Sequence, residues 1–216
     1  MAIKPILFNT EMVRAILDGR KSCTRRILKH DVESILNSPY HKKNPEVEDR
    51  QIISRLCQPP YQPGDILYVR ETWCKGIERY IYRANYSDTE KFYRDGKEIK
   101  MKWHPSIHMP KEAARIWLKV TNVRVERLQE ITEDQTEEEG FLFTPPCLHM
   151  TGENYCDIDG PCTSEIKYCD MGAGELFGKV LWNSTIKKSD LDRYGWDANP
   201  WVWVIEFERC EKPERV

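Results

Sequence analysis

The sequence predicts an α+β fold, a small β-barrel with flanking helices, from three features of its pattern. Apolar segments typical of strands stand at 4–8 and 66–69, and a long alternating run follows at 116–125. Apolar pairs at i,i+4 spacing indicate helices over 10–17 and 176–181. A closing strand then follows near the C-terminus. Short strands interrupted by two or three helices suit such a barrel, although the pattern alone leaves other mixed folds open.

Length and composition fit a soluble globular chain. The 216 residues suit one domain with insertions, and a net charge of −2 excludes a generally basic nucleic-acid coat. Any nucleic-acid contact must therefore come from a local patch. No apolar run is long enough for a signal peptide or a membrane span, so we expect a cytoplasmic protein with reduced cysteines and no membrane partner. The sequence leaves the oligomeric state open.

The first elements follow from local signals. A strand is expected over 4–8 and a helix over 10–17, with Asn9 or Thr10 as N-cap and Gly19 at the C′ position. Residues 22–28 are expected to be extended.

Prolines then dominate residues 31–62, where Val32 and Leu36 favour only one short helix. We expect a loop insertion here. A Pro-Gly turn leads into the buried strand over 66–69, and a short strand covers 79–84.

The segment 92–99 is predicted to be a hairpin, because its Asp-Gly pair suits a type I′ turn, and two prolines make 103–110 a loop. The run over 116–125 changes phase at Thr121 and Asn122, which indicates one long strand with a bulge.

A capping box from Thr132 to Gln135 begins the next helix, and Gly140 ends it, so Glu139 lies in its last turn. Residues 141–172 break all periodicity and hold four cysteines, which predicts a Cys-rich insertion. A helix over 176–181 and a strand with one apolar face over 201–207 complete the chain.

A basic segment follows the first helix. From Arg14 to Lys29 there are six Lys or Arg against one acid, Asp18, a formal charge of +5. In a slightly acidic chain this is a local anion-binding signal, and it makes Arg20, Arg25 and Arg26 the expected phosphate contacts. The alternative is that these charges lie at the edge of a sheet with no ligand.

Within this segment, Gly19-Arg20-Lys21-Ser22-Cys23-Thr24-Arg25-Arg26 resembles the GRK-x-x-T-x-R signature of the ASCH family in the PUA-like superfamily. Stretches at 64–73, 103–110, 131–133 and 196–203 resemble a phage and prophage branch of it, in the expected order. The resemblance spans most of the chain. It implies a single PUA-like domain over 1–216 that binds RNA or a modified nucleoside in a basic, aromatic-lined cleft.

For enzymes of this family, the resemblance implies removal of the acyl group from N4-acetylcytidine, with catalytic roles for Lys21, Thr24 and Glu139. Amide hydrolysis needs a nucleophile, a proton acceptor and a proton donor. Thr24 would attack, Lys21 would take its proton, and Glu139 would pass a proton to the leaving amine. The residues alone are equally explained by a strand threonine and solvated charges, so binding is the leading expectation and hydrolysis the alternative.

Further side chains are candidates for contacting a base. Arg70, Glu71 and Trp73 follow a strand, and Ser106 and His108 lie in a proline-bounded loop, which are positions typical of recognition. A surface pair of Arg70 with Glu71 over a core Trp73 is the alternative.

Near the C-terminus, Trp196 is the better candidate to face a ligand, and Asn199 is suited to hydrogen-bond a base edge. Trp203 is expected in the core.

Four cysteines in the second insertion carry a metal hypothesis. Zinc takes four thiolate or imidazole ligands, and a segment with few apolar residues is a natural place for a structural site. Independent free thiols are the alternative, because no C-x-x-C is present. We expect no organic cofactor. The candidate ligands are Cys147, Cys156, Cys162 and Cys169.

Overall fold

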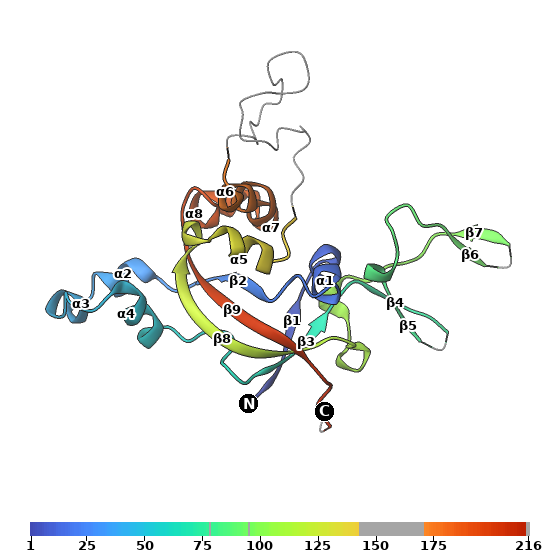
Figure 1. Ribbon diagram of the computed structural model, residues 1–216, viewed down its shortest axis with the longest axis horizontal. Coiled ribbons are helices and arrows are strands. Elements are labelled where there is room, and N and C mark those ends of the chain that lie inside the picture. Colours follow the sequence, from blue (N-terminus) through green and yellow to red (C-terminus); the bar gives the residue numbers. More distant parts are fainter. Residues whose placement is uncertain (78, 95, 143–170, 215–216) are drawn as a thin grey trace, which may run out of the picture. The chain divides into compact units, whose positions relative to one another are not determined.

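The computed structural model describes residues 1–77, 79–94, 96–142 and 171–214 as a mixed α/β chain (Figure 1). Its main sheet has five strands in the order β1-β3-β8-β9-β2. Among the described residues this order is linear, with β1 and β2 at its edges, and no closed barrel is found. The mixed fold class is thus confirmed, while the PUA-like barrel stays a prediction. The strands are β1 (Ile3–Leu7), β2 (Cys23–Ile27), β3 (Ile66–Arg70), β8 (Trp117–Arg127) and β9 (Trp201–Cys210).

The chain divides into two compact units. Unit 1 comprises Met1–Thr24, Gln58–Arg124 and Val204–Val216, and unit 2 comprises Arg25–Cys57 and Val125–Trp203. Three strands, β2, β8 and β9, contribute residues to both units. No helix among the described residues is long and apolar enough to cross a membrane.

In unit 1, helix α1 (Thr10–Leu17) has the predicted boundaries. The side chain of Asn9 accepts a hydrogen bond from the backbone N–H of Met12 at 2.8 Å, which caps the start. Gly19 follows the helix with φ of +76°, a conformation that residues with a Cβ rarely adopt. Both local signals are therefore confirmed.

Strand β1 pairs in parallel with β3, so that Ile3 lies opposite Ile66. The carboxylate of Asp65 fixes this pairing, because it accepts hydrogen bonds from the Ala2 backbone N–H and the Lys4 ammonium, each at 2.8 Å. It also accepts one from the backbone N–H of Gln62 at 3.1 Å. One buried side chain thus joins the first strand to the turn before β3.

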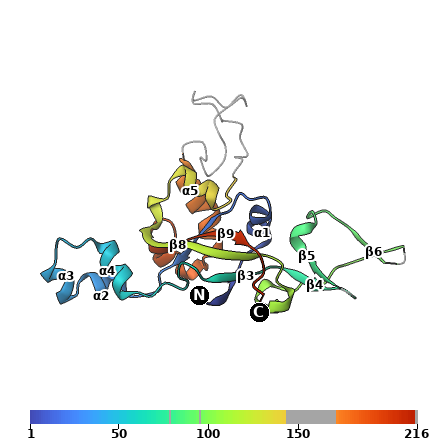
Figure 2. The same cartoon turned by 60° about the horizontal axis from the view of Figure 1, so that its bottom comes forward.

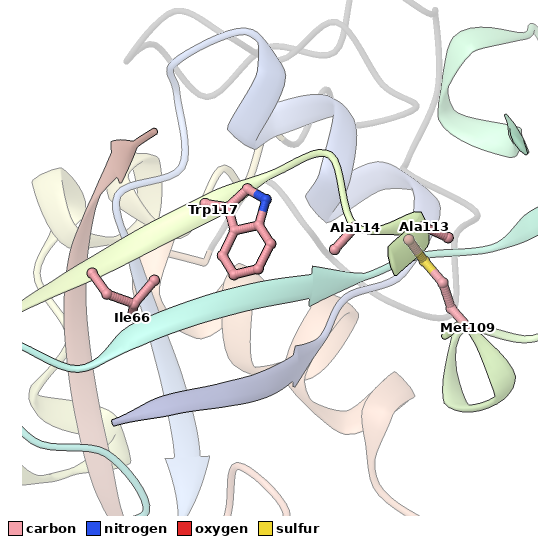
Figure 3. Close-up of a cluster of buried hydrophobic side chains, with 5 residues drawn as sticks. All are labelled: Ile66, Met109, Ala113, Ala114 and Trp117. Carbon is pink, nitrogen blue, oxygen red and sulfur yellow. The ribbon is translucent and has the colours of Figure 1, made fainter. Parts of the chain in front are cut away.

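A hydrophobic cluster lies where β3 and β8 meet two short 3₁₀ turns, η2 (Ser106–His108) and η3 (Lys111–Ala113) (Figure 3). Strand β3 is antiparallel to β8, which sets Tyr68 opposite Trp117 with ring centroids 6.0 Å apart. These contacts anchor the proline-bounded loop against the sheet. The buried members are Ile66, Met109, Ala113, Ala114 and Trp117.

Two small hairpins complete unit 1, and Figure 1 shows them near one another. Strand β4 (Trp73–Lys75) pairs with β5 (Tyr80–Tyr82), and β6 (Phe92–Arg94) pairs with β7 (Lys97–Ile99). A short 3₁₀ turn, η1 (Arg83–Asn85), follows β5. The predicted hairpin over 92–99 is confirmed, with Gly96 at φ of +75° in its turn, whereas β4 was not predicted.

In unit 2, the predicted short helix is present as α2 (Val32–Leu36), and two further helices, α3 (Pro39–Lys43) and α4 (Asp49–Leu56), form where a loop was predicted. Figures 1 and 2 show them side by side. Pro39 occupies the first turn of α3 after the N-cap Ser38, a position where proline favours a helix. Ile52 and Ile53 on α4 are fully buried. The loop prediction was therefore wrong, and only the insertion itself stays a prediction.

The rest of unit 2 is largely helical. The predicted capping box is present at α5 (Glu133–Glu138), which follows η4 (Leu128–Glu130). The predicted helix over 176–181 is longer and contains a π-helical segment: α6 (Ala173–Leu176), η6 (Phe177–Trp182) and α7 (Asn183–Thr185). Two short elements, η7 (Lys188–Asp190) and α8 (Leu191–Tyr194), precede the last strand.

The two long strands differ in how well their pattern was predicted. In β8 the neighbours Thr121 and Asn122 are both exposed, which matches the predicted change of phase. In β9 the predicted face is buried, and the residues between its members, Val202 and Val204, are buried as well, so both faces of the strand are covered over this stretch. Trp203 is a core residue, as predicted.

Candidate functional site

Lys21 and Thr24 lie in unit 1, where the chain leaves α1 and enters β2. The backbone N–H groups of Arg20 and Lys21 both donate to the carbonyl of Ala15, at 2.9 and 3.1 Å, which fixes the turn. The side chains are then directed inward, since Lys21 is 4% and Thr24 2% exposed. A lysine and a hydroxyl group thus occupy the interior on either side of Ser22 and Cys23.

Part of the lysine's environment is aromatic. The Lys21 ammonium lies 5.5 Å from the ring centroid of Phe8, within the range of a cation–π interaction. Phe8 in turn packs against Phe207 at 6.1 Å. Burying an ammonium is costly unless it is compensated, so this position is unlike that of a lysine that contacts phosphates from the surface.

Glu139 lies in unit 2 as the C-cap of α5, and it is 3% exposed. Its backbone N–H bonds to the carbonyl of Gln135 at 3.0 Å, and Gly140 follows with φ of +75°. The helix end and the glycine together explain why a glutamate at this position is turned out of solvent.

Arg25 contacts this carboxylate. One guanidinium nitrogen lies 3.3 Å from Oε1 of Glu139, and the other donates to Oε1 of Gln135 at 2.5 Å. A carboxylate oxygen of Glu126 lies 3.5 Å from the same second nitrogen. Gln135 also accepts from the backbone N–H of Thr132, which connects the capping box to the arginine.

Three of the six cations in the basic segment, Arg14, Arg20 and Arg25, pair with acids. Arg25, expected to bind phosphate, is buried against two carboxylates. Arg20 pairs with Asp18 at 2.9 Å, and Arg14 pairs with Glu11 at 2.5 Å. Arg26 is half-buried. The formal charge of +5 in the sequence therefore overstates the number of exposed cations, because the fold brings Glu126 and Glu139 to Arg25.

Arg70 and Glu71, predicted either to contact a base or to pair with each other on the surface, each bind a different partner. Glu71 is 1% exposed and accepts two hydrogen bonds from Arg115, both at 2.9 Å. Arg70 instead donates to the carbonyls of Met109, at 2.8 Å, and Ile107. The alternative of a surface pair between Arg70 and Glu71 was wrong, since each has its own partner.

Trp73 is enclosed by other rings. Its centroid lies 5.5 Å from that of Tyr80 and 5.2 Å from that of His104. Within the described part of the chain its indole N–H is buried without a hydrogen-bond partner. In the nearby η2 turn Ser106 is half-buried and His108 is exposed.

The side chains of Trp196 and Asn199 make contacts within unit 2. Trp196 is 8% exposed, and its ring lies directly against the backbone of Gly178. The side-chain oxygen of Asn199 accepts from the backbone N–H of Gln129 at 2.9 Å, and its φ is +44°. The ring of Trp196 packs inside unit 2, where the absent side chain of Gly178 leaves room for it, and its contact with a ligand stays a prediction.

The proposed zinc ligands Cys147, Cys156, Cys162 and Cys169 lie outside the described residues. Among the residues described, no group of three or more His, Cys, Asp or Glu side chains is placed to hold a metal. The four cysteines described are free thiols: Cys23, Cys57, Cys74 and Cys210. Burial raises the pKa of the Cys57 thiol.

The sequence analysis did not identify Arg115 or Glu126 as partners of the site residues, nor the hydrogen bond that Gln135 accepts from Arg25. Glu126 gives a signal in retrospect, because it is a charged residue that follows the apolar Val125 near the end of a buried strand. Gln135 was recognised only as part of a helix cap. Nothing in the local sequence around Arg115 points to Glu71, which lies 44 positions away.

Comparisons of the chain with models of known protein families, with curated proteins and with solved structures find no match.

Proposed function

We propose that this protein binds a modified nucleoside or a nucleotide of RNA on a PUA-like domain, the function that the resemblance to the ASCH family implies. The observation that supports this most is the burial of the three side chains to which the resemblance gives roles. Lys21, Thr24 and Glu139 are 4%, 2% and 3% exposed. Charged groups are seldom buried to this degree unless they are paired or used.

This burial favours a small ligand over the backbone of a long nucleic acid. Phosphate contacts along an RNA strand come from cations that reach into solvent, and Lys21 does not. Sites for small ligands instead enclose most of the ligand surface and place a few polar groups inside. A nucleoside with its base inserted fits that description better than a polymer lying on the surface.

A titration tests this proposal. Cytidine, uridine and N4-acetylcytidine are each titrated calorimetrically into the purified protein. We expect saturable binding of at least one nucleoside, with N4-acetylcytidine the tightest. If none of the three produces binding heat up to millimolar concentration, the proposal is wrong.

Hydrolysis of N4-acetylcytidine is the second candidate, and the presence of a buried hydroxyl and a buried amine close together in the chain favours it. In this reaction the Thr24 oxygen attacks the acetyl carbon while its proton passes to Lys21, which must be neutral to accept it. The bond to N4 breaks, and the Glu139 carboxylate passes the proton taken up by Lys21 to the leaving cytidine amine. Water then releases acetate from Thr24 and restores the starting protonation.

Arg25 is suited to be a positioning residue in this scheme. It fixes the orientation of the Glu139 carboxylate from one side, while Gln135 holds the guanidinium itself. A carboxylate with one defined rotamer delivers a proton to a defined point, which is what acid catalysis requires.

The reaction is followed by chromatographic detection of cytidine. Wild-type protein should release it, Thr24→Ala should release none, and Glu139→Gln should be slower by about 10² to 10⁴. A wild-type protein that binds N4-acetylcytidine and never releases cytidine refutes hydrolysis while leaving binding intact.

A further inference from the structure

A groove of about 830 Å³ opens in unit 1 beside the two small hairpins. Its volume is within the range of pockets that hold small ligands. Residues from β4, β5, β6 and β7 contribute to it, together with parts of the connecting segments. The lining consists of Cys74, Lys75, Gly76, Ile77, Arg79, Ile81, Tyr86, Phe92, Tyr93, Ile99 and Met101.

The groove presents rings and apolar side chains to solvent. Tyr93 on β6 is 63% exposed and Ile77 is 88% exposed. Tyr86 and Phe92 are less exposed, because their rings pack together at 5.0 Å and both contact Trp103. The packed rings fix the hairpin, and Tyr93 is the ring that remains accessible.

The described charged residues that line the groove are positive. Among the described lining residues there are two cations, Lys75 and Arg79, both exposed, and no carboxylate. The surrounding segment 74–103 contains eight Lys or Arg against five Asp or Glu, a formal charge of +3 in a chain whose net charge is −2. A partner with negative charge is therefore favoured here.

We propose that this groove binds a single-stranded segment of RNA, with a base stacked on Tyr93 and phosphates beside Lys75 and Arg79. A single strand combines negative charge with exposed flat rings, which are the two properties that the groove complements. A duplex keeps its base faces covered and offers Tyr93 nothing to stack on. The choice of RNA over DNA rests on the proposed function.

The consequence is a second contact surface for nucleic acid. The buried Lys21 and Thr24 are suited to bind one nucleoside. The groove would bind single-stranded RNA through base stacking and charge, without specificity for the base sequence.

The test is a fluorescence-anisotropy titration with labelled oligouridylate of about 12 nucleotides, since single-strand sites take roughly 4 to 16. Tyr93→Ala should weaken binding by about fivefold or more, and Tyr93→Phe should bind as wild type because it keeps the ring. Lys75→Ala with Arg79→Ala should make the slope of log Kd against log salt shallower, by about 0.7 for each phosphate that these two cations neutralise.

Helix α3 in unit 2 supplies matched controls, since Tyr40 is 47% exposed and Lys42 and Lys43 are exposed. Tyr40→Ala and the double change Lys42→Ala with Lys43→Ala should leave the affinity unchanged. Circular dichroism verifies that each variant is folded.

The proposal is overturned if Tyr93→Ala and the double cation variant bind oligouridylate as tightly as wild type. Equal or tighter binding of oligodeoxyuridylate overturns the assignment to RNA. The groove variants should still bind or hydrolyse N4-acetylcytidine as wild type does, and Thr24→Ala should still bind oligouridylate. The experiments therefore distinguish an error in the groove proposal from an error in the nucleoside-site proposal.

Discussion

The guanidinium of Arg25 lies 3.3 Å from the carboxylate of Glu139, although the two residues are 114 positions apart in the chain. Both side chains are almost fully buried, at 1% and 3% exposure. An ion pair removed from water in this way cannot exchange its partner for solvent. It fixes the orientation of a glutamate to which the proposed function assigns proton transfer.

We expect Arg25→Ala to reduce the free energy of unfolding by about 3–5 kcal/mol, because it leaves the Glu139 and Glu126 carboxylates buried without their cation. Urea denaturation measures this. Arg20→Ala is the matched control, since its pair with Asp18 is partly exposed and should contribute less than about 1 kcal/mol. Equal losses of stability for the two variants would show that the buried pair has no special role.

We expect the contribution of Asp65 to the free energy of unfolding to change with pH. Burial raises the pKa of this carboxyl, but hydrogen bonds from Lys4, Ala2 and Gln62 outweigh burial and hold the pKa below its usual 3.8. Because the folded-state pKa is the lower one, the stabilisation is fully present above about pH 4 and is lost as the pH falls through the folded-state pKa.

Urea denaturation of wild type and Asp65→Asn at several pH values checks this. Wild type should be the more stable at pH 7, and the difference should shrink below about pH 4 as Asp65 becomes protonated. A difference that is the same at about pH 7 and about pH 3 would contradict the role given to this carboxylate.

Gly178→Ala should destabilise unit 2. A Cβ at this position would lie 1.9 Å from Cε3 of Trp196, far inside any real contact, and the buried ring has little room to move. Overpacking typically costs about 1–3 kcal/mol, which exceeds the gain of up to about 1 kcal/mol from replacing glycine in a helix. The control is Gly172→Ala, where a Cβ meets no atom of the described residues within 4 Å. Thermal unfolding that ranks the two variants in the opposite order would refute the packing argument.

We further propose that Cys147, Cys156, Cys162 and Cys169 hold one zinc ion. Elemental analysis of protein purified without chelator should then give about one zinc per chain, and proteolysis within 141–172 should increase when the metal is removed. Cys210→Ser, which changes a cysteine far from this segment in the sequence, should leave the zinc content unchanged. Metal-free protein with a protected 141–172 segment would be incompatible with this site.

Local signals in the sequence were sufficient for local structure. Asn9 and Gly19 marked both ends of α1, and Thr132 with Gln135 marked the start of α5, because caps act within three or four residues. Over 31–62 the same rules predicted α2 and missed α3 and α4, because prolines were taken as breakers. Pro39 is in fact at the start of a helix, the position in which proline is favourable.

The arrangement of the candidate site depends on partners that no local pattern specifies. Arg25 was expected to bind phosphate because it lies in a basic segment, and only the fold brings Glu139 and Glu126 to it. Trp196 was expected to face a ligand because glycine and aspartate flank it. Its burial depends instead on Gly178, far earlier in the chain, which no periodicity of the sequence indicates.

The most direct test of the account is a calorimetric titration of N4-acetylcytidine into wild type, Lys21→Met and Arg20→Ala. Methionine keeps much of the length of the buried side chain and removes its amine. Arg20 is partly exposed and was expected to contact phosphate, which this nucleoside lacks, so its loss should leave the Kd unchanged. The account predicts saturable binding by wild type and Arg20→Ala, and binding about tenfold weaker or worse by Lys21→Met, equivalent to about 1.4 kcal/mol. No binding by wild type, or the same Kd for all three proteins, would contradict it.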